Sequence, residues 1–188
     1  MIPEMRKGFT LIEMMVVLVM VAMMLSIVVP IMHSSPSQNV RAAAKQLGRD
    51  LEQARTRALA SKSSLEIVFN TSGNSYTGYL DTDRNGLFNE NTAEMQAAAG
   101  GFPVKLPGGI SFNRGTASRV PGDTTSSSAV SFTNNRLTFA TNGITTPFGT
   151  AGTIYLASTL NTGIVAAVTV SGAGSLRVWL YQGGGNWQ

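Results

Sequence analysis

The sequence predicts an α+β protein in which a long N-terminal α-helix, its first half transmembrane, packs on an antiparallel β-sheet domain. Three observations predict this fold class. A run of uncharged residues lies near the N-terminus, a helical spacing of apolar positions follows it, and period-two alternation with frequent turn residues fills the rest of the chain. The 188 residues are 43% hydrophobic and 13% charged, which is typical of a folded domain and not of a disordered one.

The first element is an apolar helix over residues 9–32. From Met14 to Met32 the chain has 19 residues without a charge. At about 1.5 Å rise per residue, a helix of this length spans roughly 30 Å, the thickness of a bilayer core. Arg6 and Lys7 precede the run, so the positive-inside rule places the N-terminus in the cytoplasm and the residues after 33 across the membrane.

Two simpler interpretations of this run are a cleaved secretory signal peptide and a plain membrane anchor. A secretory signal has an apolar region of only about 7–15 residues and ends in a small-residue cleavage site. The present run is longer and ends in Val28-Val29-Pro30. Glu13 argues against both interpretations, because a carboxylate at membrane depth is costly and indicates a functional site with a partner.

The second half of the helix is expected over residues 33–63. Its apolar and small residues recur with alternating spacings of four and three, which is a narrow helical stripe. The stripe consists of Val40, Ala44, Leu47, Leu51, Ala54, Ala58 and Ser61. We expect it to pack on the protein's own β-domain, with a partner helix as the alternative. Ser37 is a candidate N-cap for a helix that restarts after Pro36.

Residues 64–188 are expected to form the antiparallel β-domain, because Leu65, Ile67 and Phe69 alternate with Ser64, Glu66 and Val68. Further strands are expected at Tyr76–Leu80, Gly109–Phe112, Ala129–Phe132, Arg136–Ala140, Thr153–Ala157, Ile164–Val170 and Leu176–Tyr181. Asn134 and Asn135 predict a tight hairpin between Phe132 and Leu137. A final hairpin is expected to turn within Val170–Leu176.

Charge and composition exclude several classes of function. The net charge of +4 comes from residues 33–62, whereas residues 63–188 contain six basic and six acidic side chains. A neutral domain is a poor candidate for nucleic-acid binding, which needs clustered Lys and Arg. There is no Cys, a single His (His33), and no motif that would activate a serine or bind a nucleotide. The sequence therefore predicts a protein that is not an enzyme.

One loop resembles half of a calcium-binding motif. Residues 81–86 read DTDRNG and match the first half of an EF-hand loop, so Asp81, Asp83 and Asn85 are candidate calcium ligands. The position that needs a glutamate is Thr92, and Glu90 and Glu94 are near it but out of register. The alternative is an Asx turn in which these side chains bond the local backbone.

The N-terminal residues Lys7-Gly8-Phe9-Thr10-Leu11-Ile12-Glu13, in front of the apolar run, resemble the signal of type IV pilins and type II secretion pseudopilins. The resemblance implies a prepilin leader at residues 1–8 that a prepilin peptidase removes by cutting after Gly8. It further implies N-methylation of Phe9, a role in assembly for Glu13, and a helix kink at Pro30.

The remainder of the chain resembles the H-type pseudopilins and FimT-like minor pilins, in its Ala- and Arg-rich segment Leu51–Lys62 and in the segment Leu137–Trp179. This resemblance implies the pilin fold, with two β-sheets on the helix. The expected function is that of a minor pseudopilin in a type II secretion pseudopilus, a filament that helps export proteins across the outer membrane. The alternative is a minor pilin of a type IV pilus, acting in assembly, adhesion, motility or DNA uptake.

The expected partners are other pilins or pseudopilins, bound through the N-terminal helix, the prepilin peptidase, and an inner-membrane assembly platform with a separate ATPase. DNA uptake ranks low because no base follows Arg177, and the terminal residues read QGGGNWQ. The expected location is the inner membrane with a single pass, a cytoplasmic N-terminus and a periplasmic domain at residues 64–188. From there the chain would enter a pilus-like filament.

Overall fold

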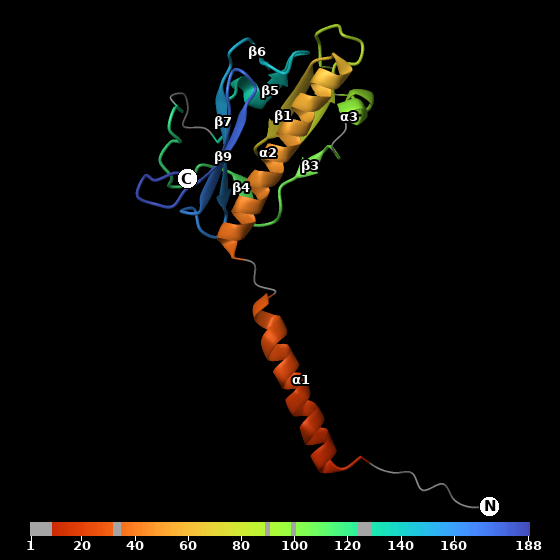
Figure 1. Cartoon of the computed structure of the whole chain (residues 1–188), viewed down its shortest axis with the longest axis vertical. Helices are drawn as coiled ribbons and strands as arrows, with labels where there is room; N and C mark the ends of the chain where they lie inside the picture. Colours follow the sequence, from red (N-terminus) through yellow and green to blue (C-terminus); the bar gives the residue numbers. More distant parts are fainter. Residues whose placement is uncertain (1–8, 32–34, 89–90, 99–100, 124–128) are drawn as a thin grey trace, which may run out of the picture. The chain divides into compact units, whose positions relative to one another are not determined.

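The computed structural model describes residues 9–31, 35–88, 91–98, 101–123 and 129–188, with the side chains of residues 25–31 left aside. The chain divides into two compact units, an N-terminal unit (Met1–Ser35) and a C-terminal unit (Pro36–Gln188). Figure 1 shows both units. Gly8 and His33 lie outside the described residues.

The N-terminal unit contains one helix, α1 (Leu11–Ile31). The expectation that residues 9–32 form a membrane-spanning helix stays a prediction. Within the described part of the chain, no helix combines the length and the apolar character that a membrane crossing requires. The described side chains of α1 run from Leu11 to Met24, which is about 21 Å of helix.

The C-terminal unit begins with α2 (Pro36–Ser61), a 26-residue helix. Pro36 occupies the first helical position, where its missing N–H has no partner to lose, so the N-cap position belongs to Ser35 and not to Ser37. The predicted stripe is buried from Val40 to Ala58, and Ser61 is partly exposed. Ala43 and Asp50 are also buried, which widens the stripe.

Two antiparallel sheets complete this unit. The first has the order β3-β2-β1-β5-β6 and the second β4-β7-β8-β9. The strands are β1 (Leu65–Asn70), β2 (Ser75–Leu80), β3 (Val104–Lys105), β4 (Ile110–Phe112), β5 (Arg136–Phe139), β6 (Thr145–Thr146), β7 (Gly152–Ser158), β8 (Val165–Val170) and β9 (Leu176–Leu180). A short helix, α3 (Thr92–Ala98), and a 3₁₀ turn, η1 (Thr133–Asn135), lie in the connections.

The predicted fold class, a long helix packed on antiparallel sheets, is confirmed. The predicted hairpin between Phe132 and Leu137 is wrong. Residues before it join the second sheet, where Val130 bridges Ile154, whereas β5 after it pairs with β1 in the first sheet. Asn134 and Asn135 do adopt positive φ, but they form a 3₁₀ turn that carries the chain from one sheet to the other.

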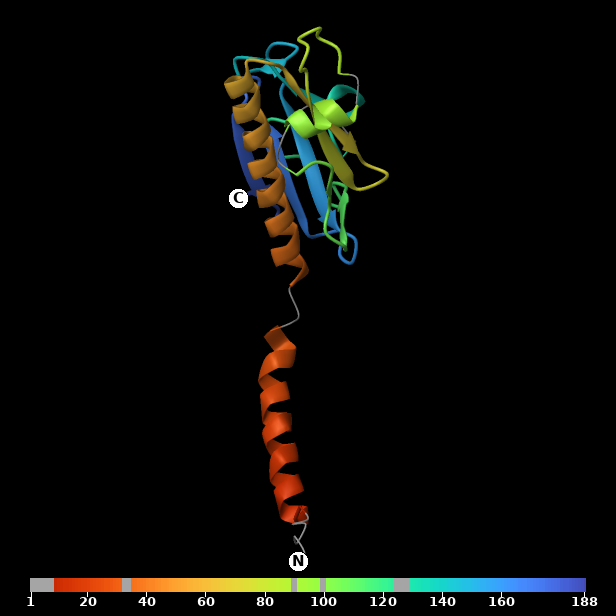
Figure 2. The ribbon, with the colours of Figure 1, turned by 90° about the vertical axis from the view of Figure 1, so that its right-hand side faces the viewer.

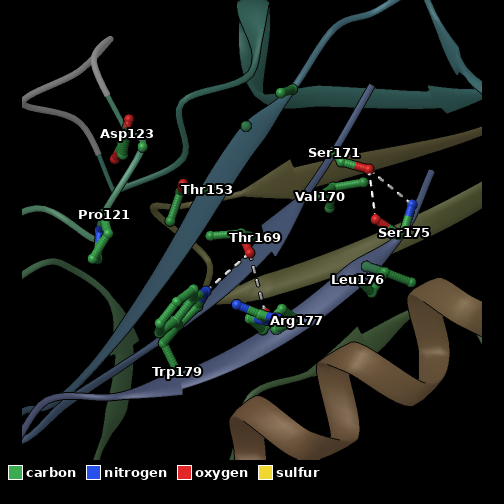
Figure 3. A pocket seen from close by; sticks show the side chains of 13 residues that line it. Pro121, Asp123, Thr153, Thr169, Val170, Ser171, Ser175, Leu176, Arg177 and Trp179 are labelled. Carbon is green, nitrogen blue, oxygen red and sulfur yellow. Dashed lines mark hydrogen bonds between the residues drawn. The ribbon is translucent and has the colours of Figure 1, made fainter. Parts of the chain in front are cut away.

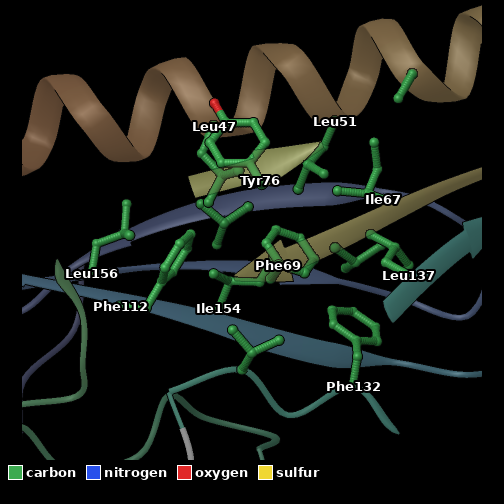
Figure 4. Packing of buried hydrophobic residues seen from close by; sticks show 14 of the residues in the cluster. Leu47, Leu51, Ile67, Phe69, Tyr76, Phe112, Phe132, Leu137, Ile154 and Leu156 are labelled. Carbon is green, nitrogen blue, oxygen red and sulfur yellow. The ribbon is translucent and has the colours of Figure 1, made fainter. Parts of the chain in front are cut away.

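The core forms where α2 meets both sheets. Leu47 and Leu51 point from α2 toward the strands, with Tyr76, Phe69 and Phe112 beneath them (Figure 4). The Phe69 and Phe112 rings, from different sheets, meet edge to face with centroids 5.9 Å apart. Figure 2 shows α2 running along one side of the sheets. This packing buries one side of the helix and leaves Arg41, Lys45 and Arg49 exposed on the other.

Two buried carboxylates are tied to neighbouring elements. The hydroxyl of Tyr76 on β2 donates to Asp50 Oδ2 at 2.5 Å, and Gln46 Nε2 donates to Asp50 Oδ1 at 2.7 Å. Burial, followed by this bond to Asp50, raises the pKa of Tyr76 far above its ordinary value. On β1, Glu66 Oε2 accepts from Arg136 Nη1 on the paired strand β5 at 2.5 Å. Each bond offsets the cost of burying a charge.

Leu51→Ala removes a side chain with 0% exposure at the centre of this core. We expect the free energy of unfolding to fall by about 2–5 kcal/mol, because the substitution leaves a cavity between α2 and the sheets. Urea unfolding of the full chain in detergent measures the change. The exposed Gln53→Ala on the same helix is the control, with an expected change within about 0.5 kcal/mol. Equal losses in the two variants would contradict the packing described.

Candidate functional site

The residues in front of α1 form a helix cap. Thr10 occupies the N-cap position, and its Oγ1 accepts a hydrogen bond from the backbone N–H of Glu13 at 3.2 Å. Glu13 is the third helical residue, so Thr10-x-x-Glu13 is a capping-box sequence. A carboxylate in the first turn is also favoured by the helix dipole. The local role of Thr10 was missed from the sequence, although the spacing of Thr and Glu could have revealed it.

Glu13 lies in an apolar, unpartnered surface. Every described side chain from Phe9 to Met24 is exposed, and Phe9 itself is 72% exposed. Residues 9–31 contain no basic side chain, so this segment of the chain offers Glu13 no cation. A carboxylate surrounded by apolar side chains needs an external cation when the helix is buried in lipid or among other helices.

Gly8 and Pro30 are the other two residues predicted to function at this end of the chain. Gly8, the predicted cleavage position, is outside the described residues. Pro30 is within α1, which continues one residue further to Ile31, and its side chain is not described. Cleavage after Gly8, methylation of Phe9 and a kink at Pro30 therefore stay predictions.

The structure brings two of the three candidate calcium ligands together with a third carboxylate. Carboxylate oxygens of Asp81, Asp83 and Glu94 lie within 4.8 Å of one another. Glu94 arrives through α3, which Asn91 caps by accepting the Glu94 N–H at 2.8 Å. Asn85 stays beside this group, since its Nδ2 donates to Asp83 Oδ2 at 2.7 Å, but its Oδ1 accepts the Leu87 N–H at 2.6 Å. The third clustered carboxylate is therefore that of Glu94, which the sequence pattern did not place there.

The same loop also satisfies its own backbone. Asp81 Oδ1 accepts the Asn85 N–H at 3.1 Å, and Asp81 Oδ2 accepts the Gly86 N–H at 3.0 Å. Gly86 has a φ of 77°, which glycine adopts without strain. Asp83 Oδ1 also accepts the Asn85 N–H at 3.3 Å, which is the two-residue contact of the Asx-turn alternative. An all-oxygen donor set also suits calcium chemically, so calcium binding stays a prediction.

A second aromatic cluster covers the outer face of the second sheet. Tyr155 on β7 packs near Trp187, which in turn stacks near Tyr181 with ring centroids 5.1 Å apart. The Tyr155 hydroxyl accepts the Val120 N–H at 3.1 Å and donates to Asp123 Oδ2 at 2.5 Å. These contacts hold the Val120–Asp123 segment against the sheet.

A hollow of about 570 Å³ lies beside this cluster, across β7, β8 and β9 (Figure 3). On its β9 side, the guanidinium of Arg177 stacks over the Trp179 ring, 5.1 Å from the centroid. Trp179 Nε1 donates to Thr169 Oγ1 at 3.0 Å, which fixes the ring. The lining contains the hydroxyl groups of serines and threonines. It contains neither His nor Lys, the residues that commonly take the proton from a nucleophilic hydroxyl.

Comparison with known proteins gives one family and a small group of solved structures. Residues 5–29 match the family described as "Prokaryotic N-terminal methylation motif". A comparison with curated proteins gives no match. The minor pseudopilin EpsH from the Type 2 Secretion System of Vibrio cholerae is 14% identical, over 74% of this chain and 95% of that chain, with a TM-score of 0.48.

The type IV minor pilin FimU of Pseudomonas aeruginosa appears in two crystal forms, each 16% identical to this chain. One form covers 75% of this chain and 88% of FimU with a TM-score of 0.48. The other covers 73% and 90% with a TM-score of 0.44. The motif match covers only the N-terminal residues of this chain, and the solved structures resemble it at low identity.

The calcium prediction is checked by calorimetric titration of the full chain in detergent. If Asp81, Asp83 and Glu94 bind calcium, we expect saturable binding below millimolar calcium that Glu94→Gln weakens, because the variant removes one charged ligand. Glu52→Gln, on the exposed side of α2, is the control and leaves binding unchanged. Absence of binding below millimolar calcium would remove the prediction and leave the Asx turn.

Because of Tyr155, we expect the free energy of unfolding to change with pH in the alkaline range. Burial, and then the hydrogen bond to Asp123, raises the pKa of Tyr155 to about 12 in the folded protein. The unfolded value is about 10, so the stabilising contribution is complete below about pH 10 and is lost as pH rises toward 12. Urea unfolding between pH 8 and pH 12 should show a steeper loss for the wild type than for Tyr155→Phe. Parallel pH profiles would contradict this.

Proposed function

We propose that this chain is a minor pseudopilin of a type II secretion pseudopilus, made as a precursor and assembled into a helical filament. The observation that carries the proposal is the methylation motif at residues 5–29, with Glu13 inside an apolar helix. The fold is consistent with this role, because the C-terminal unit has a hydrophobic core of its own.

The proposed maturation begins with cleavage after Gly8 and N-methylation of Phe9. Cleavage creates a positively charged amine on Phe9, directly before the Thr10 cap. The apolar run from Met14 to Met32 supports a membrane anchor before assembly, with the C-terminal unit in the periplasm. A prepilin peptidase would perform the cleavage, and a separate ATPase with its platform would supply the energy for extraction from lipid.

Assembly then depends on charge pairing in an apolar environment. Glu13 has no basic side chain within residues 9–31, and the Phe9 amine of a neighbouring subunit is the cation that maturation supplies. Two buried charges that pair offset each other's desolvation, whereas either one alone is strongly unfavourable. Glu13 therefore selects lateral positions in which a neighbour's N-terminus is adjacent, and the exposed apolar side chains of α1 pack the filament core.

Glu13→Ala tests this mechanism. We expect the variant to be processed, as mass spectrometry of an N-terminal peptide that starts at methylated Phe9 would show, but to be lost from the filament by about tenfold or more. The matched control is Glu52→Ala, which removes an exposed carboxylate paired only with Arg55 on α2. Sheared filaments quantified by immunoblot give the readout. Wild-type incorporation of a processed Glu13→Ala chain would contradict the role of Glu13.

The export role is separated from the alternative, a minor pilin of a type IV pilus, by an in-frame deletion strain and its complemented parent. The extracellular proteome and the sheared surface fibres are compared in the same cultures. We expect loss of specific exported proteins with surface fibres intact. Loss of fibres with unchanged export would replace the secretion role by that of a minor pilin, with Glu13 acting in the same way.

A further inference from the structure

Among the described residues, the longest edge strand of the C-terminal unit is β9. Each sheet has two edges, and three of the four edge strands are short, with two residues in β3, two in β6 and three in β4. β9 has five residues, Leu176–Leu180. The β4 edge is lengthened by residues 129–131, which bond β7 beside it. Long open edges are templates for pairing with another strand, and proteins cover or shorten them unless they are used.

The backbone groups of β9 alternate between the sheet and the open side. In the β8–β9 pair, Tyr181 N–H donates to Val165 O, so Tyr181, Trp179 and Arg177 face β8. Leu180, Val178 and Leu176 face outward. The outward groups of Leu180 pair with Gln188, through bonds of 2.7 and 3.0 Å. Among the described residues, the outward backbone groups of Val178 and Leu176 have no hydrogen-bond partner.

Gln188 thus pairs with Leu180 at the position that a residue of an added strand would take. A strand continuing this line would meet two residues, Val178 and Leu176, and would make up to four main-chain hydrogen bonds. The alternating outward residues are about 6.8 Å apart, and the new strand would lie about 4.8 Å from β9. This interaction is β-augmentation, in which the backbone supplies affinity and alternate side chains supply specificity.

Both faces of this edge carry a hollow. On the inner face, a groove of about 350 Å³ runs between α2 and β9, lined by Lys45, Gly48, Arg49, Glu52, Leu176 and Val178. Its narrow point is Gly48, where an added Cβ would meet Val178 Cγ2 at 3.2 Å. On the outer face lies the hollow beside Arg177 and Trp179 (Figure 3). Side chains of an added strand would thus enter concave space alternately on the two faces.

The charges around the edge select the partner. Arg177 stacks on Trp179 but makes no ion pair or side-chain hydrogen bond with any described residue, so its donors are oriented and free. The outer hollow also contains Asp123, whose Oδ2 accepts the Tyr155 hydroxyl. A ligand with an acidic side chain opposite Arg177 is complementary to the guanidinium, and one with a basic side chain there is not.

We propose that the Leu176–Val178 edge of β9 binds an extended strand of another protein subunit, with alternating acidic and apolar residues. An acidic residue lies opposite Arg177 on the outer face, and apolar residues lie opposite Leu176 and Val178 on the inner face. The inference goes beyond the proposed function. It concerns only the C-terminal unit and does not depend on cleavage at Gly8 or on Glu13.

The test uses the full chain in detergent and two capped synthetic octapeptides as probes, one alternating Val with Glu and the other Val with Lys. We expect the Val/Glu peptide to bind at least about tenfold more tightly than the Val/Lys peptide. Hydrogen exchange should then show new protection of the Leu176 and Val178 amides, while those of Arg177 and Trp179, which face β8, remain as before. Protection confined to other segments would overturn the proposal.

Two variants and a control separate the backbone from the charge. Val178→Pro removes an outward N–H without removing a bond to β8, so we expect at least about tenfold weaker binding of both peptides. Val178→Thr keeps the N–H and retains binding. Arg177→Glu should reverse the preference toward the Val/Lys peptide, which a loss of folding would not produce. Unchanged preference in Arg177→Glu, or equal binding by Val178→Pro and Val178→Thr, would overturn the proposal.

Discussion

The contact between the buried side of α2 and the two sheets is the interaction on which the rest of the structure depends. Alanines at positions 43, 44, 54 and 58 let the helix backbone approach the strands, while Leu47 and Leu51 fill the space between them. Gly48 has a specific reason to be glycine, because a Cβ there would press on Val178. Glycine costs about 1 kcal/mol in a helix interior relative to alanine, and here it permits the close packing of β9.

Much of the fold could be predicted because its signals are local. The stripe from Val40 to Ala58 defined the buried side of α2, and alternation found β1, β2 and β7–β9. The prediction that failed concerned which strands pair with each other. The Asn134-Asn135 turn has the backbone that its residues favour, but the strand after it pairs with β1, a partner about 70 residues away in sequence. Local turn chemistry does not encode which sheet a strand joins. The two-residue strands β3 and β6 have no period to detect, and α3 is barely two turns long.

The candidate sites divide in the same way. Thr10 and Glu13 belong to a sequence motif, so their spacing alone indicated a functional N-terminus, and the cap between them follows from the same spacing. The sequence could not place Glu94 beside Asp81 and Asp83, because the EF-hand spacing assumes a continuous loop. In the structure, Glu94 reaches the two aspartates from the first turn of α3. The sequence could not predict that β9 is an edge strand either. Edge position is a property of the finished sheet, and Arg177 and Trp179 look like ordinary strand residues until that position is known.

The bond between Asp50 and Tyr76 has a mechanical consequence. It joins the middle of α2 to β2 inside the core. A helix that slid along the sheets by one turn, about 5.4 Å, would separate the buried carboxylate from the Tyr76 hydroxyl and leave it only the Gln46 amide of the same helix. An axial load on the N-terminal end of α2 therefore meets a stop at a defined position instead of a gradual slip. Apolar side chains exchange neighbours readily, but a buried charge does not. A force along α2 is therefore passed to β2 through this hydrogen bond, and the helix and the first sheet move together.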